Sequence, residues 1–235
     1  MNDKTSNEKQ IIFHALDREA EIQITERNLP HWFQPDVAIF ITFRLADSLP
    51  AEVLLRWQRE LEEWLAVRDL PKNLAMQIVS YPDANRHECL RQFAPMQQQE
   101  FKRLSDRIFH RSLDECHGSC VLRRPELAKI VGDAIRFFDD ERYDLDRFIV
   151  MPNHVHVLAQ FRPGYDLDTV SQSWMRFTAR QINKHLGTTG ALWQAEPFDH
   201  IIRSPEQFVY LQKYISDNPQ KAQLPPKNYL YWQRE

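Results

Sequence analysis

The sequence predicts an α+β fold in which helices cover one face of an antiparallel sheet. Two observations carry this prediction. Segments rich in β-branched and aromatic residues alternate with segments whose apolar residues recur every three or four positions. Their order along the chain is strand, helix, strand, strand, helix, strand, followed by one more helix. This is the order of a ferredoxin-like (RRM-like) sandwich with an added C-terminal helix.

The first expected strand covers residues 37–45, a run of β-branched and aromatic residues typical of a buried strand. Ser48 and Pro50 then open a helix whose apolar residues between positions 53 and 65 share one face. Residues 70–124 are less regular, apart from an expected helix near 97–113. We therefore treat much of this stretch as an insertion into the domain.

A further helix is expected over residues 125–139, because Pro125 suits the first helical position. Residues 147–161 predict a β-hairpin, since two apolar runs flank the turn-forming pair Pro152-Asn153. The next helix is expected over 167–186 and ends at Gly187. The residues expected on its inner side are Leu167, Val170, Trp174 and Phe177.

The last expected strand covers about 192–203, where Pro197 indicates an edge position or a bulge. The final helix has a strong start signal in Ser204–Gln207, a capping box with proline at the first helical position. Pro219 is expected to end that helix. We expect a domain over 36–225 between an N-terminal arm and a C-terminal tail, which cover residues 1–35 and 226–235.

Composition limits the class of protein. The 235 residues contain no apolar run long enough to cross a membrane, and the polar N-terminus lacks the apolar core of a secretory signal. Three scattered cysteines suit reduced thiols in a cytoplasm. A net charge of −3 argues against a nonspecific nucleic-acid binder, although the part from Arg147 onward is mildly basic. With five glycines there is no Gly-rich phosphate loop, so no nucleotide cofactor is expected.

Two histidines stand two positions apart on the second strand of the predicted hairpin. Side chains at such positions point to the same face, with Cα atoms roughly 6.6 Å apart, so that His154 and His156 can converge on one metal ion. Two imidazoles leave coordination positions open for phosphate oxygens and water. The alternative is that both histidines only occupy a polar sheet face.

Tyr210, Tyr214 and Asn218 recur every four residues on the last predicted helix and therefore share one stripe. The amide oxygen of Asn218 is a possible hard ligand for a metal. Tyr214 lies one turn from it, about 6 Å along the axis, while Tyr210 lies about 12 Å away. This spacing favours Tyr214 as a nucleophile acting on a metal-bound phosphate. The alternative makes Tyr214 a residue of the core edge and Asn218 a helix cap.

Through these motifs the chain resembles the HUH-type single-tyrosine (IS200-like) transposases, and within them the REP-associated tyrosine transposases of bacteria. The likeness runs from about residue 28 to 225. It is most specific where MPNHVHVL is combined with a downstream Tyr-x3-Asn-Pro-x-Lys. The matching stretches are Leu29-Pro30-His31-Trp32 and residues 41–50, 141–158, 177–183, 198–204 and 214–224.

The resemblance implies that Tyr214 is the nucleophile and that His154, His156 and Asn218 hold Mg²⁺ or Mn²⁺. It also implies a single-stranded DNA substrate that carries a hairpin, such as a REP-like palindrome, and a covalent 5′-phosphotyrosine intermediate. We therefore expect a metal-dependent endonuclease and strand transferase that cleaves and rejoins DNA next to such hairpins. The alternatives are a nuclease of replication initiation or conjugation, and a non-catalytic hairpin-binding protein or repressor.

Candidate DNA-binding residues are basic side chains that could contact phosphates and one aromatic residue that could stack on a base. Arg123 and Arg124 are the strongest of them, because they precede a helix start. A zinc site at Cys116, Cys120 and the more distant Cys89 is not expected, since the spacing is loose. The full set of DNA-binding candidates is Arg44, Arg123, Arg124, Arg176, Arg180, Lys184, Trp193 and Arg203.

Overall fold

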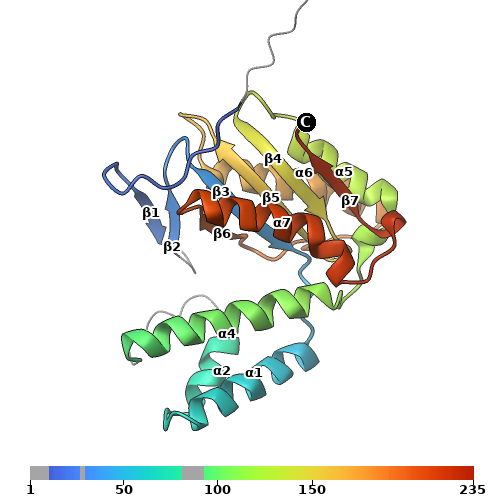
Figure 1. The fold of residues 1–235 in the computed structure, drawn as a ribbon. Helices are drawn as coiled ribbons and strands as arrows, with labels where there is room; N and C mark the ends of the chain where they lie inside the picture. The colour runs from blue at the N-terminus through green and yellow to red at the C-terminus, as the bar shows by residue number, and fades with distance from the viewer. Residues whose placement is uncertain (1–10, 27–29, 81–92) are drawn as a thin grey trace, which may run out of the picture.

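The computed structural model describes residues 11–26, 30–80 and 93–235 of the chain. Figure 1 shows two parts, a sheet with helices on both faces and a smaller helical unit. A separate two-stranded sheet near the N-terminus pairs β1 (Gln23–Glu26) with β2 (Pro30–Phe33). In the described part of the chain, no helix combines the length and the apolar character that a membrane crossing requires.

The main sheet has five strands in the order β6-β3-β5-β4-β7, and each neighbouring pair is antiparallel. Two helices, α5 (Pro125–Arg136) and α6 (Leu167–Leu186), make the connections β3-to-β4 and β5-to-β6. Without β7, the strand order and the two connecting helices are those of a ferredoxin-like sandwich, so the predicted fold class is confirmed. The strands are β3 (Ala38–Arg44), β4 (Tyr143–Val150), β5 (His154–Phe161), β6 (Phe198–Ile201) and β7 (Leu230–Gln233).

Alternating side chains of each strand enter two different cores. On β3, Ile39 and Ile41 belong to the core beneath α5 and α6, whereas Phe40 belongs to the core beneath α7 (Pro205–Lys221). Helix α7 therefore covers the opposite face of the sheet from α5 and α6 (Figure 1). This is the added C-terminal helix that the sequence predicts.

The predicted hairpin is confirmed, with β4 and β5 joined around Pro152 and Asn153. Helix α6 has the expected bounds, and Gly187 ends it with a positive φ of 67°. The expectation that Phe177 faces inward is wrong, since its side chain is 48% exposed. The buried stripe passes through Thr178 instead, whose hydroxyl donates to the carbonyl of Trp174 and accepts a bond from the indole of Trp193.

The described helices between β3 and α5 form a unit with its own core. They are α1 (Ala51–Ala66), α2 (Asn73–Ser80) and α4 (Pro95–Asp114). Its buried side chains include Trp57, Leu61 and Leu65 from α1 and Phe101 and Ile108 from α4. The apolar stripe of α1 is used here, so α5 is the first helix of the sandwich. The helical unit therefore begins well before residue 70, where the insertion was expected to start.

Two segments near the C-terminus differ from expectation. Pro219 does not end α7 but lies inside it, buried, and the helix continues because the Ala222 amide donates to the Asn218 carbonyl. The segment expected to be a tail adds β7 to the sheet edge beside β4, where Trp232 stacks on Phe148 with ring centroids 5.5 Å apart. A four-residue strand carries too short a pattern to be found by periodicity.

Candidate active site

His154 and His156 lie side by side on β5, on the sheet face covered by α7, and both are fully buried. Each ring is oriented through its Nδ1 atom. His154 Nδ1 lies 2.7 Å from Asn153 Oδ1, and His156 Nδ1 lies 2.8 Å from Thr42 Oγ1 on β3. Such bonds fix the ring and direct Nε2 toward a ligand, as the outer partners of metal-bound histidines do. Among the described residues, His154 Nε2 has no hydrogen-bond partner.

Burial lowers the pKa of both imidazoles, to about 3 for His154 and well below the ordinary value for His156. A histidine whose pKa is lowered in the fold stays neutral until the pH falls below that value. Both rings are therefore neutral at neutral pH, and each keeps a nitrogen lone pair. A neutral imidazole is the form that binds a metal ion.

Tyr214 reaches the same place from α7. Its hydroxyl lies 2.9 Å from His110 Nδ1 and 3.5 Å from His156 Nε2. Burial, followed by the neighbouring Asp114 and Tyr210, raises the pKa of Tyr214. The phenol is therefore protonated at neutral pH, and its activation requires positive charge or a proton acceptor at the hydroxyl. His110 is neutral, because burial lowers its pKa, and its Nδ1 accepts from the phenol in the tautomer that carries its hydrogen on Nε2.

Asn218 is completely buried one helical turn after Tyr214. Neither its Oδ1 nor its Nδ2 meets hydrogen-bond geometry with a described residue. Asp114 and Tyr214 nevertheless lie close enough for its amide to oppose the rise in their pKa values. A buried polar group without a well-formed hydrogen bond costs about 1–3 kcal/mol, and a bound cation would satisfy the amide oxygen. His154 Nε2 also has no hydrogen-bond partner among the described residues, and it lies on the sheet face covered by α7. His154, His156 and Asn218 therefore fit a cation held by two imidazoles and an amide oxygen. No group of three His, Cys, Asp or Glu side chains suited to a metal occurs in the described part of the chain.

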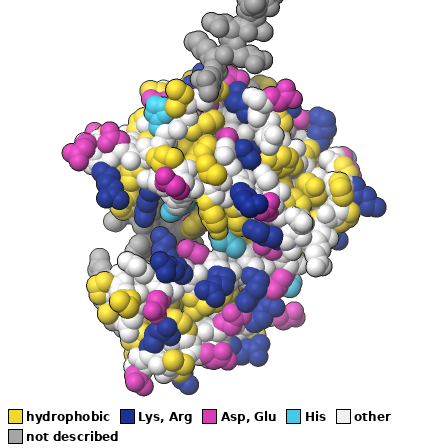
Figure 2. Space-filling model, viewed as in Figure 1, with side chains coloured by type: hydrophobic (Ala, Val, Ile, Leu, Met, Phe, Trp, Pro, Cys, Tyr) yellow, Lys and Arg dark blue, Asp and Glu magenta, His cyan; other side chains and the backbone are white. Residues whose placement is uncertain are grey.

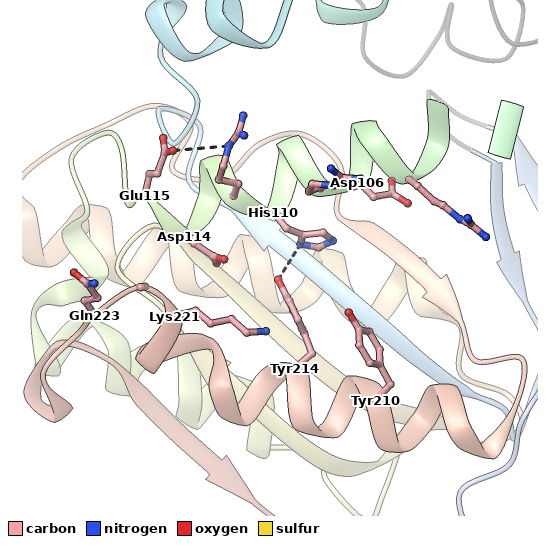
Figure 3. A pocket seen from close by; sticks show the side chains of 12 residues that line it. Asp106, His110, Asp114, Glu115, Tyr210, Tyr214, Lys221 and Gln223 are labelled. Atoms are coloured by element: carbon pink, nitrogen blue, oxygen red, sulfur yellow. Dashed lines mark hydrogen bonds and ion pairs between the residues drawn. The ribbon is translucent and has the colours of Figure 1, made fainter. Parts of the chain in front are cut away.

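The helical unit contributes two site residues that the sequence did not reveal. His110 and Asp114 lie four residues apart on α4 and face α7 (Figure 3). Burial raises the pKa of Asp114 to about 6, and its Oδ1 has no hydrogen-bond partner among the described residues. The available signal was a histidine and an aspartate one turn apart on a helix, which is too common a pattern to identify a site.

Some DNA-binding candidates lie near the histidines. Arg44 pairs in register with His154 across the sheet, and its guanidinium donates to Ser48 Oγ at 3.0 Å. Arg123 and Arg124 are exposed before α5, in a turn tied to the hairpin by the Leu122 amide, which donates to the Pro152 carbonyl at 3.2 Å. These three arginines are therefore brought toward the same end of the sheet.

Other candidates lie elsewhere. Arg176, Arg180 and Lys184 are exposed on α6, on the opposite side of the sheet from α7 (Figure 1). Arg203 is exposed before α7 and lies over the Trp32 ring, 5.8 Å from its centroid. The expectation that Trp193 stacks on a base is wrong. Its ring is buried against Phe43 in the core, which removes it from any nucleic acid.

Cys116 and Cys120 are free thiols. Burial raises the pKa of Cys116 to about 12 and also raises that of Cys120, so neither is a ready thiolate. We did not expect a zinc site at the three cysteines. The third of them, Cys89, lies outside the described residues.

Comparison with known proteins gives a family match for the segment that holds His154, His156, Tyr214 and Asn218. Residues 124–218 match the family described as "Transposase IS200 like". A comparison with curated proteins gives no match. A solved structure of a REP-associated tyrosine transposase bound to a REP hairpin is 21% identical, with a TM-score of 0.34, over 40% of this chain and 55% of that one.

The family match runs from the residue before α5 to Asn218. It therefore contains the β4–β5 hairpin with His154 and His156 and most of α7, but not the helical unit. The resemblance to the IS200-like transposases that the sequence predicts is thus confirmed over residues 124–218.

Proposed function

We propose that this protein is a metal-dependent endonuclease and strand transferase for single-stranded DNA. It cleaves and rejoins DNA beside REP-like palindromic hairpins through a covalent 5′-phosphotyrosine on Tyr214. One observation carries the proposal: the Tyr214 hydroxyl lies 3.5 Å from His156 Nε2, in a segment that matches the IS200-like transposases. Buried polar atoms of His154 and Asn218 that have no hydrogen-bond partner among the described residues support a metal site beside the Tyr214 hydroxyl.

In this mechanism His154, His156 and Asn218 hold Mg²⁺ or Mn²⁺. When bound, the cation supplies positive charge that polarises the scissile phosphate. The Tyr214 oxygen attacks phosphorus, so a bond from tyrosine to the 5′-phosphate forms while the bond from phosphorus to the 3′-oxygen breaks. The phenol proton passes to His110 Nδ1, which lies 2.9 Å from the hydroxyl in the reactant state. The departing 3′-oxygen takes up a proton from solvent and leaves as the 3′-hydroxyl. The new ester retains a reactive phosphate, so a 3′-hydroxyl can reverse the step and rejoin strands without ATP.

The test is incubation of the protein with single-stranded hairpin DNA from beside its gene, labelled at the 5′ or the 3′ end, with Mn²⁺. Because the 5′-phosphate side stays on tyrosine, only the 3′-labelled DNA should give a covalent protein adduct. The 5′-labelled DNA should give a shortened free strand. A protein that binds the hairpin but leaves both labels on intact DNA would instead be a non-catalytic hairpin-binding protein.

His110 gives a second prediction for this reaction. His110→Ala is expected to slow adduct formation roughly 100-fold, because misplacement of a nucleophile by about 1 Å has an effect of that size. Hairpin binding should not change. The measurement is the single-turnover rate of adduct formation, with His185→Ala as the control, since His185 is exposed on α6. An unchanged rate in His110→Ala would show that the 2.9 Å contact with Tyr214 has no part in the reaction.

A further inference from the structure

A cleft of about 880 Å³ lies between α4 of the helical unit and α7. Figure 3 shows that Tyr214, Tyr210 and Lys221 enter it from α7, opposite His110 and Asp114 on α4. The proposed nucleophile therefore lies in the wall of an open cleft. Any strand that reaches Tyr214 through this cleft passes along α4.

The α4 side of this cleft carries a row of arginines. Arg103, Arg107 and Arg111 are spaced four residues apart, so they share one face of the helix, and all three line the cleft. Arg111 forms an ion pair with Glu60 on α1. Within the part of the chain that the structure describes, Arg103 and Arg107 form no ion pair. Figure 2 shows Lys and Arg side chains gathered along the boundary between the helical unit and the sheet.

Three acidic side chains, Asp106, Asp114 and Glu115, also line the cleft. Glu115 pairs with Arg56 and His117. On the opposite wall, the Lys221 Nζ lies 4.8 Å from the centroid of the Tyr214 ring and adds positive charge beside the nucleophile.

Tyr210 completes the cleft. It precedes Tyr214 by one helical turn, lines the same space, and leaves 66% of its side chain exposed. An exposed aromatic ring beside a row of cations is the combination that binds single strands, since bases stack on the ring and phosphates pair with the cations. A base held in a duplex cannot stack in this way.

We propose that the cleft between α4 and α7 binds the single-stranded DNA that flanks the hairpin, next to the scissile phosphate. Arg103 and Arg107 contact successive backbone phosphates, and Tyr210 stacks on an unpaired base. Arg107 lies three residues from His110, about 4.5 Å along the helix axis, and Arg103 about 10.5 Å, so the arginines lead away from Tyr214. The helical unit is thus the second wall of the strand path. This inference rests on the proposed function.

The experiment measures binding by fluorescence anisotropy, without metal, to a labelled DNA hairpin with a single-stranded flank and to the same hairpin without it. The variant R103Q/R107Q is compared with R59Q/R136Q, which removes two exposed arginines that do not line the cleft. For the flanked DNA, R103Q/R107Q should weaken binding about tenfold or more, as loss of charge-assisted bonds does. The salt dependence, log K against log salt concentration, should become less steep by about 1.4, or about 0.7 for each lost phosphate contact.

R59Q/R136Q should change neither quantity, and R103Q/R107Q should bind the unflanked hairpin like the wild type. Tyr210→Ala should weaken binding of the flanked DNA without changing the salt slope. If R103Q/R107Q binds the flanked DNA like R59Q/R136Q, the cleft is not the strand path, whether or not the wild type forms an adduct. If the cleft variant loses binding while the wild type never forms an adduct, the proposed cleavage fails but the binding cleft stands.

Discussion

Tyr214→Phe is expected to abolish the covalent protein–DNA adduct. The rate of cleavage should fall at least about 10⁴-fold, because loss of a covalent nucleophile lowers kcat of other enzymes by that much or more. The substitution removes the one oxygen that can form the phosphotyrosine. The remaining ring keeps its contacts with Phe40 and with His156, whose centroids lie 6.0 Å and 5.3 Å away. His110 loses one hydrogen bond, which costs about 1 kcal/mol of stability, so the variant should remain folded.

The measurement is gel detection of the adduct on 3′-labelled hairpin DNA, together with hairpin affinity. The matched control is Tyr210→Phe, one helical turn earlier on the same stripe, which should still form the adduct. Tyr214→Phe should bind the hairpin as the wild type does. An adduct that persists in Tyr214→Phe and disappears in Tyr210→Phe would assign the chemistry to the other tyrosine.

The sequence predicts those parts of the site whose residues lie a few positions apart on one strand or one helix. His154 and His156 are two residues apart on a strand, and Tyr214 and Asn218 are four apart on a helix, so each pair shares a face whatever the tertiary structure. The predicted order of elements does not place α7 on the sheet face that carries the histidines. Only the resemblance to the IS200-like transposases implied that the two pairs meet. In the structure the Tyr214 hydroxyl lies 3.5 Å from His156 Nε2.

The parts that could not be predicted depend on how separate elements pack. His110 reaches Tyr214 only because the helical unit folds back over α7, a contact between residues 104 positions apart that no local pattern encodes. Trp193 illustrates the opposite error. An aromatic residue at the start of the last expected strand resembles a stacking platform, but a hydrogen bond to Thr178 and a contact with Phe43 fix it in the core. Helix periodicity likewise does not decide between Phe177 and Thr178 on the inner side of α6.

The two units of the protein therefore divide the work of the proposed reaction. The sheet supplies neutral, oriented imidazoles, because burial on the face under α7 lowers their pKa values and Thr42 and Asn153 fix their rings. The helical unit supplies His110 at the nucleophile and the arginine row of the cleft. Since the family match excludes the helical unit, the α4 contribution is a feature of this chain beyond the matched segment.

His156→Ala and His154→Ala are expected to weaken Mn²⁺ binding more than about 100-fold, because loss of even an outer partner of a metal ligand weakens affinity 10–100-fold. Metal-dependent adduct formation should fall with it. Binding of Mn²⁺ is measured directly by calorimetry on the protein without DNA, so the result does not depend on cleavage. His185→Ala on α6 is the control and should bind Mn²⁺ like the wild type.

Each alanine also leaves a small cavity in a buried face, so thermal unfolding of each variant must accompany the titration. A variant that is folded, binds the hairpin and still binds Mn²⁺ with unchanged affinity would remove that histidine from the metal site. The two histidines are distinguishable in the adduct assay at saturating Mn²⁺. His156 also contacts the Tyr214 hydroxyl, whereas His154 Nε2 has no partner among the described residues. Excess metal should therefore restore His154→Ala further than His156→Ala, because only the second variant also loses a contact to the nucleophile.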